Sequence, residues 1–220
     1  MNCEKINNFT YSIKNNTNIN NTNINTIFFT SIINSKILEN NSACLIKKKD
    51  GYNESINSIT FSALTVERAT DFFIGKSLDE KYQLLIKLLW CINKQNNSLK
   101  DFDQGFYNIC LHDILVIDSS VFIFINLDYI KQIKNDCYII NFPFIKNEHL
   151  LPELTEIKSI PCAANTNCFN YTLGSIVFYI LFKKHFKKQM NLKIELIDIY
   201  KTKLYWCIMK CLKNNILILI

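Results

Sequence analysis

The middle of the chain changes its hydrophobic pattern partway along, and this change limits the folds available to it. Across residues 78–94 apolar side chains recur with a period near 3.6, which predicts an amphipathic helix. Two short β-prone runs follow at residues 114–117 and 121–125. The residues between them, Asp118-Ser119-Ser120, are typical of a tight hairpin turn. A long helix combined with an antiparallel hairpin indicates an α+β fold.

The rest of the chain divides into three parts by composition. Residues 1–25 are polar, repeat Asn-Thr-Asn and lack helical periodicity, so we expect a disordered or weakly ordered leader. Residues 26–68 contain short β-prone runs, at 27–29, 43–46 and 59–61, separated by turn residues, which predicts a small β region. Residues 69–220 then form a mainly helical part, with further helices expected near 171–183 and 194–212.

The positive charge of the chain comes almost entirely from lysine. The net charge is +6, and Arg68 is the only arginine. Because arginine is the residue suited to bidentate contacts with bases, sequence-specific nucleic-acid binding is disfavoured. Lysines cluster at residues 47–49 and 183–188. We interpret these clusters as solvated faces, with attraction to acidic surfaces or non-specific attraction to nucleic acid as the alternative.

The cysteines and the apolar segments indicate an intracellular protein. Nine cysteines are scattered without a C-x-x-C pair or histidines at zinc spacing, which favours buried free thiols in a reducing compartment. Residues 1–14 have no apolar core of signal-peptide length. The most apolar stretch, residues 171–182, has about 12 residues, whereas a bilayer needs about 20. We therefore predict a buried helix there and no transmembrane segment.

The order of these parts resembles that of protein kinases: a small β region, a long helix, a tight hairpin, a Pro-Glu loop and a buried helix with Leu-Gly. Leu64-Thr65-Val66-Glu67-Arg68 resembles the hinge strand of that family, whose backbone holds the adenine, so Glu67 is a candidate cofactor-binding residue. The resemblance implies a kinase-like fold with a reduced N-terminal β lobe and a mainly helical C-lobe.

The resemblance places altered residues at the catalytic positions. Aligning residues 114–117 with the strand after the kinase catalytic loop puts Asp113 at the metal-binding Asn and Asn108 at the catalytic Asp. Continuing through the hairpin, Asn126 falls on the Asp of the D-F-G motif. An amide cannot accept the substrate proton, so these catalytic-equivalent positions, Asn108, Asp113 and Asn126, are expected to be inactive.

Motifs on either side extend the resemblance with further departures. Leu151-Pro152-Glu153 resembles A-P-E, and residues 169–174 resemble the start of the central buried helix, although Phe169 replaces its anchoring Asp. Residues 204–212 resemble the late helix, after which no arginine follows to pair with Glu153. Lys47 is placed where the family's lysine holds the α- and β-phosphates, yet no glycine precedes Gly51 to form the glycine-rich cover.

Three functions follow from these observations. The first is a pseudokinase that binds a protein partner, a kinase or its substrate, and needs no cofactor. The second is a divergent serine/threonine kinase that uses ATP and magnesium, with Leu111-His112-Asp113 as its H-R-D triplet and Asp128 as metal ligand. The third is a basic structural or membrane-surface protein that uses residues 183–188. The coding bias toward Asn, Ile and Lys suits a large DNA virus or a reduced parasite.

Overall fold

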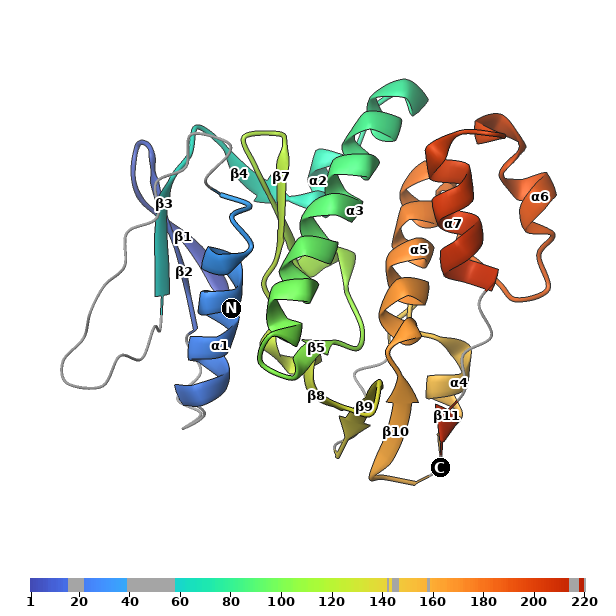
Figure 1. The fold of residues 1–220 in the computed structure, drawn as a ribbon. Coiled ribbons are helices and arrows are strands. Elements are labelled where there is room, and N and C mark those ends of the chain that lie inside the picture. Colours follow the sequence, from blue (N-terminus) through green and yellow to red (C-terminus); the bar gives the residue numbers. More distant parts are fainter. Residues whose placement is uncertain are drawn as a thin grey trace.

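The computed structural model describes residues 1–15, 22–38, 58–141, 143, 147–157, 159–213 and 218–219. It confirms a mixed α+β fold, in which several helices accompany small antiparallel sheets (Figure 1). One continuous cluster of buried hydrophobic side chains runs from the N-terminal strands to the last helix. None of the helices in the described ranges is both long and apolar enough to cross a bilayer.

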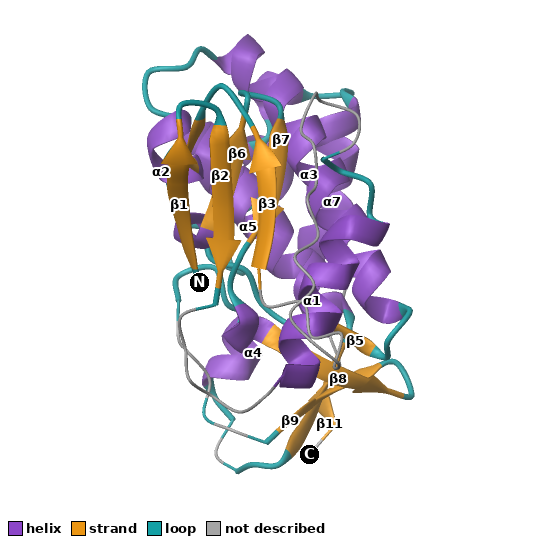
Figure 2. Ribbon diagram, turned by 90° about the vertical axis from the view of Figure 1, so that its left-hand side faces the viewer, coloured by secondary structure: helices purple, strands orange, loops and turns teal. Residues whose placement is uncertain are grey.

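The N-terminal residues form a sheet, so the prediction of a weakly ordered leader over residues 1–25 is wrong for residues 2–14. Strands β1 (Asn2–Asn7), β2 (Thr10–Lys14) and β3 (Ser58–Ser62) pair antiparallel in that order, and the sheet lies in front of the helices in Figure 2. Tyr11 and Ile13 are buried opposite Phe61 and Ile59. These partners lie far along the sequence, so local composition did not indicate the pairing.

Residues 27–29, predicted as a strand, and residues 22–25, predicted as part of the leader, lie instead in helix α1 (Thr22–Asn34). Phe28, Phe29 and Ile32 are fully buried at the i, i+1 and i+4 spacing of a helix face. The β-prone composition was misleading because α1 packs against α3, and this packing determines the local conformation. The predicted strand at 43–46 and Lys47 fall outside the described residues.

Helix α3 (Leu78–Lys100) confirms the predicted long helix and extends it at its C-terminal end. Its start is stabilised by a capping box. The Ser77 backbone N–H and hydroxyl both donate to Glu80 Oε2, and the Glu80 backbone N–H donates to Ser77 Oγ. This bonding lowers the pKa of the Glu80 carboxyl. The prediction stopped at residue 94 because the next buried positions are the polar residues Gln95 and Asn96.

The predicted hairpin is present as β6 (Ile114–Ile117) and β7 (Val121–Phe124), with β4 (Val66–Arg68) paired on the other side of β6. Asp118 and Ser119 have φ values of 47° and 55°. Positive φ at both central residues is the geometry of a type I′ turn, whose twist matches that of the flanking strands. The hairpin is fully buried apart from this turn.

A second sheet in the C-terminal part was not predicted. Its order is β11-β10-β9-β8-β5, with every neighbouring pair antiparallel. The strands are β5 (Gln104–Phe106), β8 (Ile130–Lys134), β9 (Cys137–Ile140), β10 (Cys162–Asn165) and β11 (Ile218–Leu219). Residues 69–220 are therefore less predominantly helical than expected. The strands are short, and apart from the β8–β9 hairpin they join segments that are distant in sequence, which leaves little local signal.

The C-terminal helices lie side by side at one end of the molecule (Figure 1). Helix α5 (Asn167–Phe182) confirms the predicted buried helix. The single helix predicted over 194–212 is wrong, because the chain forms a short α6 (Leu192–Glu195) and a separate α7 (Lys203–Lys213). Between them Lys201 has a φ of 61°, a left-handed conformation that interrupts a helix. Short helices α2 (Ala69–Phe72) and α4 (Pro152–Thr155) complete the described helices.

The eight cysteines that the structure describes are all free, in agreement with the sequence prediction. Cys91, Cys137, Cys162 and Cys168 are buried, whereas Cys207 is exposed on α7. Burial is the main cause of the raised pKa of the Cys91 and Cys168 thiols.

Replacing Gly174 by alanine is expected to destabilise the protein by about 1–2 kcal/mol. A Cβ at this position would lie 2.6 Å from Cys211 Cβ, where α5 packs on α7. This clash outweighs the helix-propensity gain of about 1 kcal/mol that alanine normally has over glycine. Chemical denaturation measures the loss. In a double-mutant cycle, Cys211→Gly should remove part of it, whereas strictly additive effects would contradict the close approach.

Candidate functional site

The two ends of the β6–β7 hairpin bring Asp113 and Asn126 together. Asp113 directly precedes β6, and Asn126 follows β7 by one residue. Antiparallel pairing places these ends side by side, and Ile125 N–H donates to the Asp113 carbonyl at 3.0 Å. The Asn126 side-chain amide donates to Asp113 Oδ2 at 2.8 Å. The two residues that the kinase resemblance places at metal-binding positions are therefore directly bonded to each other.

The second polar atom of the Asn126 side chain is also used within the chain. Its Oδ1 accepts a hydrogen bond of 3.1 Å from Asp128 N–H, which caps the 3₁₀ turn Leu127–Tyr129. Because one end of the side chain caps this turn and the other holds Asp113, Asn126 has a structural role in linking the hairpin to the chain that follows. Asp128, the metal ligand in the alternative alignment, is exposed.

Asn108 lies inside the protein and away from solvent. Its exposed fraction is 0%, and its Oδ1 accepts a hydrogen bond of 2.9 Å from Ile109 N–H. Its side-chain nitrogen has no hydrogen-bond partner among the described residues. The next residue is bonded as well, because the Asn147 side-chain amide donates to the Ile109 carbonyl at 3.3 Å. A buried amide with this bonding has no access to a substrate hydroxyl, so the structure does not bring Asn108 to a surface with the other two positions.

Three further side chains near this site were not singled out from the sequence. Tyr129, Cys110 and Lys131 are wholly or partly buried, and burial is the largest cause of the raised pKa of Tyr129 and Cys110 and of the lowered pKa of Lys131. Lys131 Nζ donates to the Asp128 carbonyl at 2.8 Å and lies over the Tyr107 ring. Lys131 follows an apolar run by a few residues, which by itself is no signal for a site.

The hinge-like strand is held to the hairpin through its backbone. The N–H groups of Leu64 and Thr65 both donate to Asp118 Oδ1, at 2.7 Å and 3.0 Å. Glu67 is exposed and lies opposite Val116 in the β4–β6 pairing. Arg68 donates to the His112 carbonyl at 3.2 Å. The backbone donors of Leu64 and Thr65 are therefore already bonded inside the protein.

Glu153, expected to have no arginine partner, has a lysine partner instead. Lys188 Nζ lies 2.7 Å from Glu153 Oε1. Lys188 comes from the loop after α5, not from the segment after α7 where the resemblance would place the partner. Because the lysine side chain is 77% exposed, solvent screens this pair and it adds little to stability.

Of the two aligned positions at the hairpin ends, Asp113 carries a carboxylate and Asn126 an amide. Magnesium held against phosphates normally binds one or two carboxylates, and a kinase combines these with a lysine on the phosphates. Here the Asp113 carboxylate already accepts the Asn126 amide. Within the described ranges no three His, Cys, Asp or Glu side chains come together. Lys47, the predicted phosphate ligand, lies outside those ranges.

Changing Asn126 to aspartate is expected to destabilise the protein by about 1–2 kcal/mol at pH 7 and to create a response to magnesium. The change replaces a hydrogen bond of 2.8 Å with two carboxylates at the same separation, and like charges this close oppose ionisation. Thermal unfolding with and without Mg²⁺ measures both effects. The exchanged variant D113N/N126D is the control, because it keeps one amide and one carboxylate. Unchanged stability in N126D would contradict the direct contact between the side chains of residues 113 and 126.

Comparison with known proteins identifies no family for this chain. No protein-family model matches it, and no curated protein matches its sequence.

Proposed function

We propose that the chain is a pseudokinase, a protein-kinase-like protein that transfers no phosphate and acts by binding another protein. The observation that carries the proposal is the direct bond between Asn126 and Asp113 at the hairpin ends. Phosphoryl transfer depends on metal-binding carboxylates and on an Asp that accepts the substrate proton. Here one aligned metal position is the amide Asn126, and it is bonded to the carboxylate of Asp113 at the other position. This arrangement supports the loss of phosphoryl transfer.

The environment of Asn108 supports the same proposal. A general base must reach the proton that it removes, either directly or through one water. The Asn108 side chain is a neutral amide, and it is fully buried and bonded to the backbone next to it. The change Asn108→Asp alone would therefore place a carboxyl group in the interior and would not create a general base at the surface.

The hinge-like strand favours a role without bound nucleotide. Adenine recognition by a hinge requires backbone groups that are open to the ligand. The Leu64 and Thr65 N–H groups donate instead to Asp118, a residue of the hairpin turn. Breaking these bonds to admit a ligand would leave the Asp118 carboxylate without its partners, which costs free energy.

We expect the protein to show no stabilisation by magnesium and ATP. A ligand at 100 times its dissociation constant adds about 2.7 kcal/mol to the unfolding free energy, which in a chain of this size raises the melting temperature by roughly 5–10 °C. Differential scanning fluorimetry with ATP, with and without Mg²⁺, measures the shift. The wild type should melt at the same temperature in all conditions.

Two variants distinguish the alternatives if a shift appears. A magnesium-dependent shift that Asp113→Ala abolishes would overturn the pseudokinase proposal and favour an active, divergent serine/threonine kinase. Loss of the shift in both Asp113→Ala and Asp128→Ala would favour the alignment that uses Asp128 as metal ligand. Lys134→Ala is the control, because this exposed lysine lies at the end of β8, away from the hairpin ends.

A further inference from the structure

The positive charge of the protein is concentrated in one segment near its C-terminus. Residues 183–213 contain nine lysines and two acidic residues, a net charge of +7, whereas the whole chain carries +6. The remainder therefore has a net charge of −1. This segment comprises the loop after α5, helix α6 and helix α7. Long-range attraction therefore favours this segment as the place where an anionic partner approaches.

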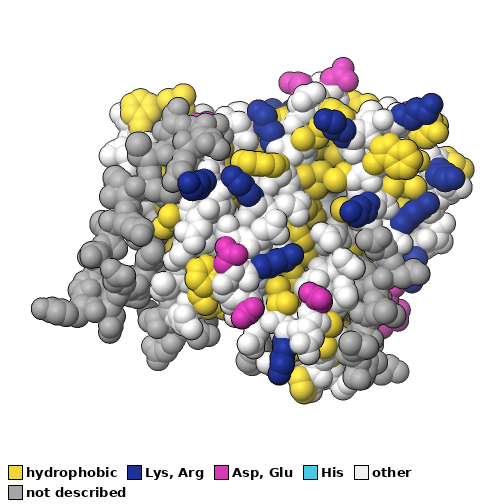
Figure 3. Space-filling model, in the orientation of Figure 1, with side chains coloured by type: hydrophobic (Ala, Val, Ile, Leu, Met, Phe, Trp, Pro, Cys, Tyr) yellow, Lys and Arg dark blue, Asp and Glu magenta, His cyan; other side chains and the backbone are white. Residues whose placement is uncertain are grey.

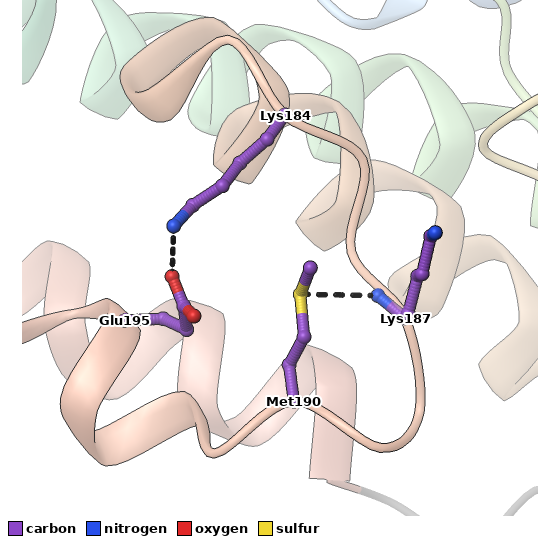
Figure 4. A network of polar contacts seen from close by, with 4 residues as sticks. All are labelled: Lys184, Lys187, Met190 and Glu195. Carbon is purple, nitrogen blue, oxygen red and sulfur yellow. Dashed lines mark hydrogen bonds and ion pairs between the residues drawn. The ribbon is translucent and has the colours of Figure 1, made fainter.

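Two lysines of the predicted cluster at 183–188 are already paired. Lys184 forms an ion pair with Glu195 of α6, and Lys188 pairs with Glu153. Figure 4 shows the first pair, with Lys187 N–H donating to Met190 Sδ at 3.4 Å and the Lys187 side chain pointing away from Met190. These contacts hold the loop against α6. The basic surface is therefore better represented by α6 and α7 than by the lysine run itself.

Exposed hydrophobic side chains accompany the lysines on α6, on α7 and in the connection between the two helices. Ile194 of α6, Ile197 of the connection and Trp206 of α7 are 67%, 62% and 61% exposed. Figure 3 shows hydrophobic and lysine side chains gathered over these two helices on one side of the molecule. We call the exposed residues Lys193, Ile194, Ile197, Lys203, Trp206 and Lys210 the α6–α7 face. An exposed apolar patch surrounded by charge marks an interaction site more often than a solvated face.

The α6–α7 face is supported by packing beneath it. Lys203, Trp206 and Lys210 recur at the i, i+3 and i+7 spacing of one helix stripe. The opposite side of α7 is buried against α5. Tyr205 contacts the Trp206 ring with centroids 5.0 Å apart and the Tyr200 ring at 5.3 Å. The exposed side chains are therefore presented by a helix whose other face is part of the core.

We propose that the α6–α7 face binds the surface of an anionic lipid membrane. Interfacial membrane segments combine lysines, which are attracted to anionic headgroups, with Trp and aliphatic side chains that enter the headgroup region. The segment contains no arginine, the residue preferred for bidentate phosphate contacts in nucleic-acid sites, and its exposed isoleucines have no role in binding a purely acidic peptide. Charge and exposed apolar area together favour lipid. This proposal is independent of the pseudokinase proposal.

Vesicle co-sedimentation of the full chain tests the binding. Vesicles of phosphatidylcholine with about a third phosphatidylserine should pellet the protein, and pure phosphatidylcholine vesicles should not. Each lysine near an anionic surface contributes roughly a fivefold increase in partitioning, so the triple variant K193E/K203E/K210E should bind about 100-fold more weakly. The matched control K5E/K100E/K134E changes three exposed lysines elsewhere and should bind nearly as the wild type does.

Removing the apolar side chains separates lipid from other anionic partners. I194S/I197S/W206S keeps every charge and should reduce vesicle binding at least tenfold, because the lost apolar area no longer enters the headgroup region. If this variant binds like the wild type, the contact is purely electrostatic and the proposal is wrong. Binding to poly-glutamate or RNA that exceeds binding to the anionic vesicles would also overturn it. Circular dichroism melts of each variant identify any that fail to fold.

Tryptophan emission locates the contact without relying on charge changes. The chain has two tryptophans, Trp90 on α3 and Trp206 on α7. In the W90F background, anionic vesicles should shift the Trp206 emission to shorter wavelength as the ring leaves water. In the W206F background, Trp90 should not respond. A shift of Trp90 alone would place the membrane contact on another face and overturn the proposal, even where all lysine variants fold.

Discussion

Replacing Gln95 by methionine is expected to lower the free energy of unfolding by roughly 2–5 kcal/mol. Gln95 is fully buried on α3 and bonds both backbone groups of Phe124 in β7. Its Nε2 donates to the Phe124 carbonyl at 2.9 Å, and its Oε1 accepts from Phe124 N–H at 3.1 Å. Among the described strands, β7 is the end strand of its sheet, so these groups have no ladder partner there. Methionine fills the space but leaves both unpaired, at about 1–3 kcal/mol each.

Urea denaturation followed by circular dichroism measures this loss. Gln83→Met on the same helix is the matched control, because Gln83 is exposed and the chemical change is the same. It should alter stability by less than about 0.5 kcal/mol. Because Phe124 is only two residues before Asn126, weakening its anchor should also loosen the end of the hairpin that holds Asp113. Equal stability of the two variants would show that β7 is not held by Gln95.

Acidification from pH 6.5 to pH 4 is expected to cost about 3 kcal/mol of stability through His149 alone. Burial, with a smaller contribution from nearby His185, lowers the pKa of His149 from 6.5 to about 4. The unfolded chain therefore binds a proton below about pH 6.5 that the folded chain does not bind until about pH 4. Stability contributed by neutral His149 is present above pH 6.5 and is lost as the pH falls through this window.

The surroundings of His149 explain why its ring stays neutral. Its Nδ1 lies 3.2 Å from Ser175 Oγ, and its ring packs against Tyr179 and His185. His185 in turn lies 2.9 Å from a Glu148 carboxylate oxygen. The Glu148 carboxylate is thus bonded to the other histidine, and burial of the His149 ring disfavours its charged form.

A comparison of two histidine variants tests the pH effect. Unfolding free energies of wild type and His149→Asn, measured from pH 4 to pH 7, should differ in slope, because asparagine retains polarity but does not titrate. His112→Asn is the control, because it makes the same substitution at an exposed histidine. Parallel curves for the wild type and His149→Asn would show that His149 titrates as in the unfolded chain.

The elements that sequence reasoning predicted correctly are those with a strong local pattern. Helix α3, helix α5 and the β6–β7 hairpin were all expected, because a helical period, a continuous apolar run and a turn dipeptide are each readable over a few residues. The strands within residues 2–14 were missed, since their apolar positions are few and the β3 partners of β2 lie about 50 residues away. The kinase resemblance itself remains a prediction.

The candidate site shows the same division. The kinase alignment put Asp113 and Asn126 at the two ends of the predicted hairpin, and the antiparallel pairing of β6 with β7 brings those ends together. Nothing local indicated that Asn108 would be fully buried or that Lys188 would pair with Glu153. Both outcomes depend on contacts between segments that are distant in the sequence.

By itself, the sequence determined the α+β class, the main helices, the hairpin and the accumulation of lysine near the C-terminus, because each is a property of a short continuous segment. The tertiary structure alone decided which polar groups are bonded and which lysines remain available at the surface. Whether a polar side chain is buried, paired or exposed depends on segments that are far apart in the chain, and that information does not exist until they pack together.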